Sequence, residues 1–301
     1  MVRIKVPAST ANLGAGFDSL GIALSLYDCF TIEEADGCFI SSSDGSFVPT
    51  GTDNLVYQSA RHLYELCGKP FPGLRIVEEN RIPMARGLGS SSACIVGGLF
   101  GANELLRQPL SRDALLREAV LLEGHPDNVA PALLGGFTVS ALDGNDVAFV
   151  RSDLPETLCF AAFIPNFELK TADARAVLPE SYSRSDTVYN LSHAALMASS
   201  LLTGQWKNLR LASGDRLHQP YRLALIPGGE SLLRNAEEQG ALASFISGAG
   251  STLLAIFDGE RDEIRQKAAS LLSDPLYAGW ELKLLSVDNE GARSCPFEVD
   301  L

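Results

Sequence analysis

A glycine- and serine-rich stretch at residues 83–94 sets the strongest limit on how this chain folds. It follows an extended segment and leads into small, helix-tolerant residues, which predict a helix over 93–106 capped by the serines at 90–92. Gly87 and Gly89 let the backbone take positive φ or approach a ligand closely. The first turn of such a helix presents unpaired N–H groups and the positive end of the helix dipole. The stretch therefore predicts a phosphate-binding loop, with an ordinary turn before a helix as the alternative.

Composition limits the classes of partner. The 301 residues are 46% hydrophobic, which is enough for one large or two medium domains. A net charge of −13 argues against nucleic-acid and anionic-membrane surfaces, because those partners favour Lys/Arg clusters. The 6 cysteines are scattered without a Cys-x-x-Cys pair, which indicates reduced thiols rather than a zinc ribbon or a disulfide framework. With no apolar run of membrane-spanning length and no signal peptide, we expect a cytoplasmic protein.

Hydrophobic periodicity and capping residues predict the elements of the first half. Strands are expected over 2–7, 22–34 and 74–79, a hairpin over 137–150, and helices over 52–67, 93–106 and 111–122. We place a domain boundary at residues 152–156, which divides the chain into domains 1–155 and 156–301.

The second half predicts strands over 158–164, 242–246, 253–257 and 281–287, and helices over 170–179, 185–202, 230–239 and 259–272. This order of elements, with two strands joined by a tight loop, suggests an antiparallel α+β sheet.

Two polar clusters interrupt these patterns. Residues 123–137 carry Glu123, His125, Asp127 and Asn128, and two prolines predict an ordered turn there rather than a helix. A turn with Asp127 and Asn128 at its corner would explain this composition on structural grounds alone. Residues 218–222 predict a second, compact polar loop.

Segments 7–18, 83–93 and 247–251 resemble, in kind, order and spacing, the three motifs of the GHMP small-molecule kinases. Residues 123–131, together with Thr171 and Arg175, narrow the resemblance to the homoserine kinases within that superfamily. The resemblance covers nearly the whole chain. It implies an α+β fold of two domains, in which an ATP-binding domain like the second domain of ribosomal protein S5 precedes a ferredoxin-like domain.

The resemblance also implies roles for individual residues. The nucleotide phosphates would be bound by Pro83, Met84, Ala85, Arg86, Gly87, Leu88, Gly89, Ser90, Ser91, Ser92 and Ala93, with Gly248 and Gly250 from the third motif. The homoserine site would comprise Asn12, Asp18, His125, Asn128, Thr171, Arg175 and Arg222. In this set Asp18 suits the substrate ammonium, the two arginines suit its carboxylate, and Asn12 or Asn128 would orient the hydroxyl. Asn12, Asp18 and Asn128 are therefore the expected catalytic residues.

Members of the family bind magnesium through a glutamate and a hydroxyl of the phosphate loop, here Ser91 or Ser92. The chain offers Glu118 and Glu123, and their spacing from the polar turn does not choose between them. Ser251 stands where the family usually has proline, which predicts a looser third motif. We find no lysine and aspartate pair to act as a base, so we expect direct attack by the hydroxyl, with its proton passing to phosphate oxygens or to water bound by Asn128.

The activity that this resemblance implies is ATP-dependent phosphorylation of L-homoserine to O-phospho-L-homoserine, a step of threonine biosynthesis. Another GHMP kinase, acting on mevalonate or a sugar, is one alternative, although a sugar has no carboxylate for the arginines and mevalonate no ammonium for Asp18. A nucleotide-binding sensor without turnover is the other, and an intact set of Asp18, His125 and Asn128 argues against it. Homodimers are common among relatives, but no stretch of the sequence identifies an interface.

Overall fold

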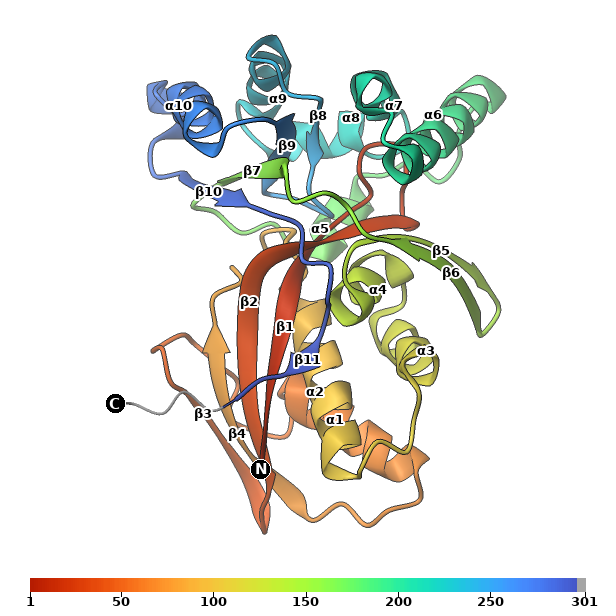
Figure 1. The fold of residues 1–301 in the computed structure, drawn as a ribbon, viewed down its shortest axis with the longest axis vertical. Coiled ribbons are helices and arrows are strands. Elements are labelled where there is room, and N and C mark those ends of the chain that lie inside the picture. The colour runs from red at the N-terminus through yellow and green to blue at the C-terminus, as the bar shows by residue number, and fades with distance from the viewer. Residues whose placement is uncertain (297–301) are drawn as a thin grey trace.

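The computed structural model describes residues 1–296 and consists of two bodies, each built on its own sheet, stacked along the long axis (Figure 1). The first sheet contains β1 (Val2–Ala11), β2 (Leu20–Glu34), β3 (Gly37–Ser42), β4 (Gly73–Asn80), β5 (Phe137–Asp143), β6 (Asp146–Ser152) and β11 (Arg293–Ser294). Helices α1 (Leu55–Leu66), α2 (Ser90–Leu105), α3 (Arg112–Glu123) and α4 (Pro126–Leu134) lie along one side of it.

Helix α2 lies close against β2, and this contact fixes the position of the glycine- and serine-rich stretch. A Cβ atom on Gly97 would lie 2.4 Å from the ring of Phe30, and one on Gly101 would lie 2.5 Å from Ile32. Both apolar side chains are fully buried in the core beneath the helix. The small residues that follow the serines therefore let the helix approach the sheet, with its amino end at the junction of the two bodies.

The second sheet has the strand order β10-β7-β9-β8, with every pair antiparallel. Its strands are β7 (Leu158–Ile164), β8 (Ala243–Ile246), β9 (Leu253–Asp258) and β10 (Glu281–Leu285). The accompanying helices are α5 (Thr171–Ala176), α6 (Arg184–Thr203), α7 (Leu209–Ala212), α8 (Gln219–Arg222), α9 (Gly229–Glu238) and α10 (Arg261–Leu271). The predicted antiparallel α+β sheet is confirmed.

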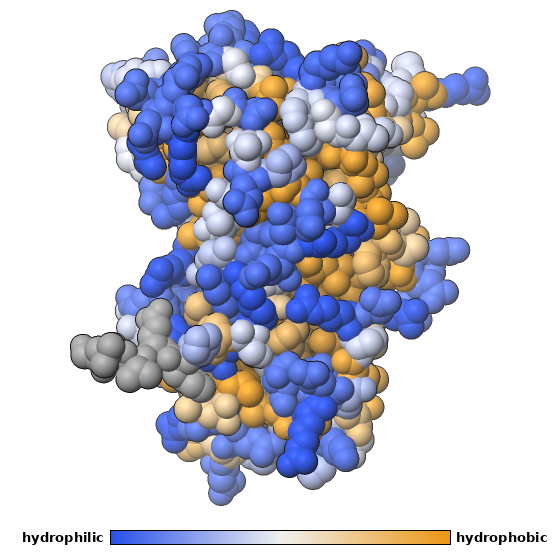
Figure 2. All heavy atoms as spheres, in the orientation of Figure 1, coloured by the Kyte–Doolittle hydropathy of each residue, from blue (hydrophilic) through white to orange (hydrophobic). Residues whose placement is uncertain are grey.

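After β10 the chain returns to the first body, where β11 pairs with β1. The division at residue 155 stays a prediction. On the face in Figure 2, hydrophilic residues cover much of both ends, and hydrophobic residues are seen along the side where Figure 1 places β5, β6 and α6. Within residues 1–296, no helix is long and apolar enough to cross a membrane.

The prediction of a turn instead of a helix at residues 123–137 is wrong, because Pro126–Leu134 forms α4. Pro126 occupies the first turn, where a missing N–H costs nothing. Pro131 lies inside the helix and has no N–H to donate to the carbonyl of Asp127. That carbonyl oxygen instead faces Gly21 on β2, where a Cβ atom would lie only 1.9 Å from it. Packing against a glycine of the sheet thus allows the interrupted helix.

Several smaller predictions also need correction. The polar loop at 218–222 is a short helix, α8, with His218 at its cap. The expected serine cap of α2 is absent, because Gly89 in the left-handed conformation precedes it and Ser90 is its first residue. Helix α1 is capped by Asn54 rather than by residues 52–53. Strands β3 and β11 had no clear signal in the sequence.

Candidate functional site

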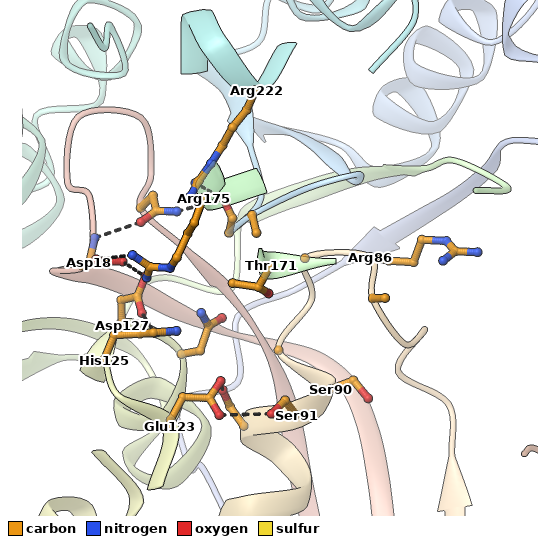
Figure 3. A pocket seen from close by; sticks show the side chains of 18 residues that line it. Asp18, Arg86, Ser90, Ser91, Glu123, His125, Asp127, Thr171, Arg175 and Arg222 are labelled. Atoms are coloured by element: carbon orange, nitrogen blue, oxygen red, sulfur yellow. Dashed lines mark hydrogen bonds and ion pairs between the residues drawn. The ribbon is translucent and has the colours of Figure 1, made fainter. Parts of the chain in front are cut away.

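Three loops that are far apart in sequence meet at the junction of the two bodies. They follow β1, precede α2 and connect β8 to β9. Backbone hydrogen bonds join Ser9 N to Leu88 O, Thr252 N to Arg86 O and Gly248 N to Ala11 O, at 3.1, 3.0 and 3.2 Å. Together with the end of α3 and with α4, α5 and α8 they enclose one pocket (Figure 3), lined by Asn12, Asp18, Ala85, Arg86, Gly87, Gly89, Ser90, Ser91, Ser92, Glu123, His125, Asp127, Asn128, Thr171, Arg175, Arg222, Gly248 and Ala249.

The amino end of α2 has the features of an anion site. Gly87 and Gly89 both have φ of 75°, and a Cβ atom on either would lie 2.1 Å from a neighbouring oxygen, Ser247 O or Ser9 Oγ. No side chain caps the helix, and no acidic residue occupies its first turn. Its first N–H groups, the positive end of its dipole and the serine hydroxyls are therefore directed to the pocket without a competing carboxylate of the same turn.

Glu123 ends α3 beside this anion site. Its carboxylate accepts hydrogen bonds from Ser91 Oγ at 3.1 Å and from Ser92 Oγ at 2.8 Å (Figure 3). Glu118 lies outside the pocket and contacts His62 Nε2 at 2.6 Å. A carboxylate and two hydroxyls beside an anion site form a set of oxygen ligands that could hold a divalent cation.

Asp18 and Arg175 face each other across the pocket and form a bidentate ion pair, with Arg175 Nη2 2.8 Å from Oδ1 and Nη1 3.1 Å from Oδ2. Figure 3 shows the Arg175 side chain extending towards Asp18, with Arg222 reaching down from above Arg175. The residues expected to hold opposite ends of a substrate are therefore paired with each other. Both are about one-third exposed, so solvent and ligands reach the pair.

The two asparagines of the predicted site have protein partners. Asn12 Oδ1 accepts from the backbone N–H of Asp18 at 2.9 Å, and its Nδ2 donates to Gly248 O at 2.8 Å. Asn12 thus joins the first motif to the third. Asn128 Oδ1 accepts from Ser9 Oγ at 3.0 Å, and its side chain lines the pocket beside α2.

Asp127 lines the pocket, although the sequence indicated no role for it beyond the corner of a turn. Its Oδ1 lies 2.6 Å from His125 Nδ1, and the carboxylate is almost fully buried. Burial lowers the pKa of His125, but the hydrogen bond and charge of Asp127 outweigh that effect, so the pKa is raised overall. One carboxylate oxygen of Asp18, one ring nitrogen of His125 and one carboxylate oxygen of Asp127 lie within 4.8 Å of one another. The spacing of two residues between His125 and Asp127 is the signal that could have identified the pair.

Arg222 is 1% exposed, yet its guanidinium reaches the pocket. Nε donates to Ala174 O at 3.1 Å and Nη1 donates to Gly248 O at 3.2 Å. Burial, followed by the positive charge of Arg175, lowers the pKa of Arg222 to about 10, so it remains charged at neutral pH. Thr171 begins α5 and lines the pocket one turn before Arg175.

Some residues of the predicted motifs do not line the pocket. These are Pro83, Met84, Leu88, Ala93, Gly250 and Glu118. Leu88 is fully buried and packs in the core. Ser251, expected to loosen the third motif, is also fully buried and donates to Phe167 O at 2.9 Å, a bond that a proline could not make.

Comparison with known proteins identifies the family. Residues 54–136 match the GHMP kinases N terminal domain, and residues 197–274 match the GHMP kinases C terminal model. Homoserine kinases from Clostridium acetobutylicum and Clostridium beijerinckii are 43% and 44% identical over 97% of this chain and over 99% and 98% of their own lengths. The crystal structure of homoserine kinase from Cytophaga hutchinsonii has a TM-score of 0.87 at 28% identity, covering 98% of this chain and 97% of that one. The chain belongs to the homoserine kinases, within the GHMP kinases.

Proposed function

We propose that this chain transfers the γ-phosphate of ATP to the side-chain hydroxyl of L-homoserine, giving O-phospho-L-homoserine and ADP, as a step in threonine biosynthesis. One observation carries the proposal. The amino end of α2 lines one part of a single pocket, and Asp18, Arg175 and Arg222 line another part. The first part suits a nucleotide phosphate, and the second suits a small zwitterion that carries an ammonium and a carboxylate.

The nucleotide phosphates lie, on this proposal, against Gly87, Gly89 and the serines that begin α2. Magnesium fits the same place, because Glu123, Ser91 and Ser92 supply oxygen ligands, which Mg²⁺ prefers, beside the phosphate site. When bound with ATP, magnesium supplies positive charge against the phosphate oxygens. Glu118 has no part in this site, since it faces His62.

Homoserine binding replaces the ion pair between Asp18 and Arg175. The substrate ammonium takes the place of the Arg175 guanidinium at Asp18, and the substrate carboxylate takes the place of Asp18 at Arg175, with Arg222 as its second partner. Each of the two charges thus exchanges one partner for another of the same sign. A sugar offers neither charge, and mevalonate lacks the ammonium, so the pocket favours an amino acid over both.

In the transfer step the homoserine hydroxyl oxygen attacks the γ-phosphorus, the bond from that phosphorus to the bridging oxygen of ADP breaks, and the hydroxyl proton passes to a phosphate oxygen. Among the described residues no lysine lines the pocket, so no lysine is available there to lower the pKa of the attacking hydroxyl. Positioning and charge stabilisation carry most of the rate in such loose transition states. On this proposal Asn128, which lines the pocket, orients the attacking hydroxyl or a water beside it.

An ADP-release assay with MgATP tests the proposal. The acceptors are L-homoserine, mevalonate, galactose and none. We expect turnover with homoserine alone. Turnover with another alcohol would keep the chain among the GHMP kinases but contradict the homoserine assignment. ATP binding without turnover for any acceptor would instead favour a nucleotide sensor.

A further inference from the structure

His218 lies directly behind the arginine assigned to the substrate carboxylate, although it does not line the pocket. Its side chain is fully buried, and Arg222 is almost so. His218 caps α8 and Arg222 ends it, so the two residues are four apart and their side chains lie on the same side of one turn. The sequence indicated a polar loop here and gave His218 no role.

Two hydrogen bonds determine which nitrogen of His218 carries the proton. Arg222 Nη1 lies 3.3 Å from Nδ1, and a guanidinium can only donate, so Nδ1 is the acceptor. Nε2 lies 2.7 Å from the carbonyl oxygen of Gly14, which can only accept, so Nε2 carries the hydrogen. Only the neutral imidazole protonated at Nε2 satisfies both bonds.

The surrounding charges agree with a neutral ring. Burial lowers the pKa of His218 and the charge of Arg222 adds to the effect, whereas Asp215 and Asp18 oppose it without reversing it. Asp215 lies 3.6 Å from Nε2, but its carboxylate accepts from four other groups, namely the backbone N–H groups of Leu217, His218 and Gln219 and the side chain of Asn190. Asp215 therefore holds the start of α8 and does not require a second proton on the imidazole.

The hydrogen bond to Nδ1 completes the immobilisation of Arg222. Nε and Nη1 already donate to the carbonyls of Ala174 and Gly248. The bond from Nη1 to His218 is a third contact, and together the three hold the Arg222 guanidinium in one orientation. Nη2 is then the nitrogen left for a ligand in the pocket. The ring of Phe17 stacks on His218 with centroids 5.1 Å apart and lies 5.1 Å from the Arg222 guanidinium carbon.

We propose that His218 is a positioning residue for the substrate carboxylate. Its Nδ1 orients the Arg222 guanidinium, and its Nε2 ties that guanidinium to the loop after β1, which also carries Asp18. His218 acts through Arg222 and does not touch the substrate. The inference rests on the proposed function, because it takes the homoserine carboxylate as the ligand of Arg222.

Two conservative variants separate the two bonds. In His218→Gln the amide nitrogen can replace Nε2 and keep the bond to Gly14, but the acceptor for Arg222 is lost. In His218→Asn the amide oxygen can replace Nδ1 and keep that acceptor. We expect His218→Gln to raise the KM for homoserine about tenfold, with kcat and the KM for ATP changed less than about twofold. We expect His218→Asn to raise the KM for homoserine about threefold at most. His62→Gln, on α1 outside the pocket, is the matched control.

An equal rise of the homoserine KM in both variants, or a loss of kcat at unchanged KM, would show that His218 only supports the core. The tautomer gives a second test that does not depend on the variants folding. In ¹⁵N-histidine-labelled wild-type protein at neutral pH, the His218 nitrogens should report hydrogen at Nε2 only. Hydrogen at Nδ1, alone or with Nε2, would overturn the inference. Absence of wild-type turnover with homoserine would instead contradict the proposed function, and the tautomer would still report on the link to Arg222.

Discussion

Glu118 and Glu123 lie on the same helix, yet only Glu123 faces the pocket. Five residues correspond to a rotation of about 140° around a helix, so the two side chains point in clearly different directions. The sequence offered both carboxylates because it did not reveal the face that α3 turns towards α2. The hydroxyls of Ser91 and Ser92 mark that face.

Replacing Glu123 is therefore expected to impair the use of magnesium. Glu123→Gln removes the charged oxygen ligand, and we expect kcat to fall about 100-fold, with a higher Mg²⁺ concentration needed for half-maximal rate. Glu118→Gln loses only its contact with His62 and should keep the wild-type magnesium dependence. Titrating MgCl₂ at fixed ATP measures both. Equal magnesium dependence in Glu123→Gln and wild type would remove Glu123 from the metal site.

Asp28 on β2 gives a pH-dependent contribution to stability. Its carboxyl is fully buried and accepts from the backbone N–H of Ile82 at 2.8 Å, just before the glycine- and serine-rich stretch. Burial raises its pKa to about 7. The folded protein therefore holds a proton that the unfolded chain releases near pH 4. The stabilisation is complete below about pH 4, falls as the pH rises, and is lost above about pH 7.

We expect the free energy of unfolding to fall by at most about 4 kcal/mol from this group between pH 4 and pH 8. Asp28→Asn imitates the neutral acid and should remove that part of the pH dependence, which makes it more stable than wild type at pH 8. Urea unfolding across the pH range measures the difference. Asp146→Asn, at an exposed position of β6, is the control. Parallel pH profiles for wild type and Asp28→Asn would contradict the shifted pKa.

At the scale of the elements, the loop before α2 contacts the loop between β8 and β9 at Gly87. Gly87 combines a φ of 75° with a backbone oxygen, Ser247 O, 2.1 Å from the place of a Cβ atom. Ser247 Oγ also donates to Gly87 O at 2.6 Å. The loop before α2, which belongs to the first body, is thereby attached to the second body.

Gly87→Ala should disturb this attachment as well as the backbone. Gly68, with φ of 62° and no atom within 4 Å of a Cβ, is the matched control, because Gly68→Ala introduces only the backbone strain. We expect Gly68→Ala to cost about 1 kcal/mol with ATP affinity retained, and Gly87→Ala to cost more and to weaken ATP binding at least about tenfold. Calorimetric titration with MgATP measures the affinity. Equal ATP affinity in the two variants would contradict the role of this contact.

Helices and loops were predictable where neighbouring residues along the chain determine the backbone conformation. The glycines and serines at 87–92 indicated a loop before a helix, and Ser111 caps α3 as expected. Helix α4 was not predictable, because its proline is accommodated by Gly21 on another strand. Local propensity contains no information about such a partner. The same limit applies to β3 and β11, which exist through pairing with β4 and β1.

At the scale of the whole molecule, the site exists because two bodies supply different parts of it. The first supplies the loop before α2, Asp18 and Glu123, and the second supplies Arg175 and Arg222. The family's motifs predicted most of these residues from the sequence. They did not predict the ion pair between Asp18 and Arg175 or the buried partners Asp127 and His218, because those contacts depend on how distant segments meet.

The central claim is that phosphate is transferred to the side-chain hydroxyl of homoserine. The most direct test is ³¹P NMR of the product formed from MgATP and L-homoserine. We predict one new phosphomonoester signal, split into a triplet by the two protons of the carbon that carried the hydroxyl, and an equal amount of ADP. An acyl phosphate on the carboxyl group, or inorganic phosphate as the only product besides ADP, would contradict it.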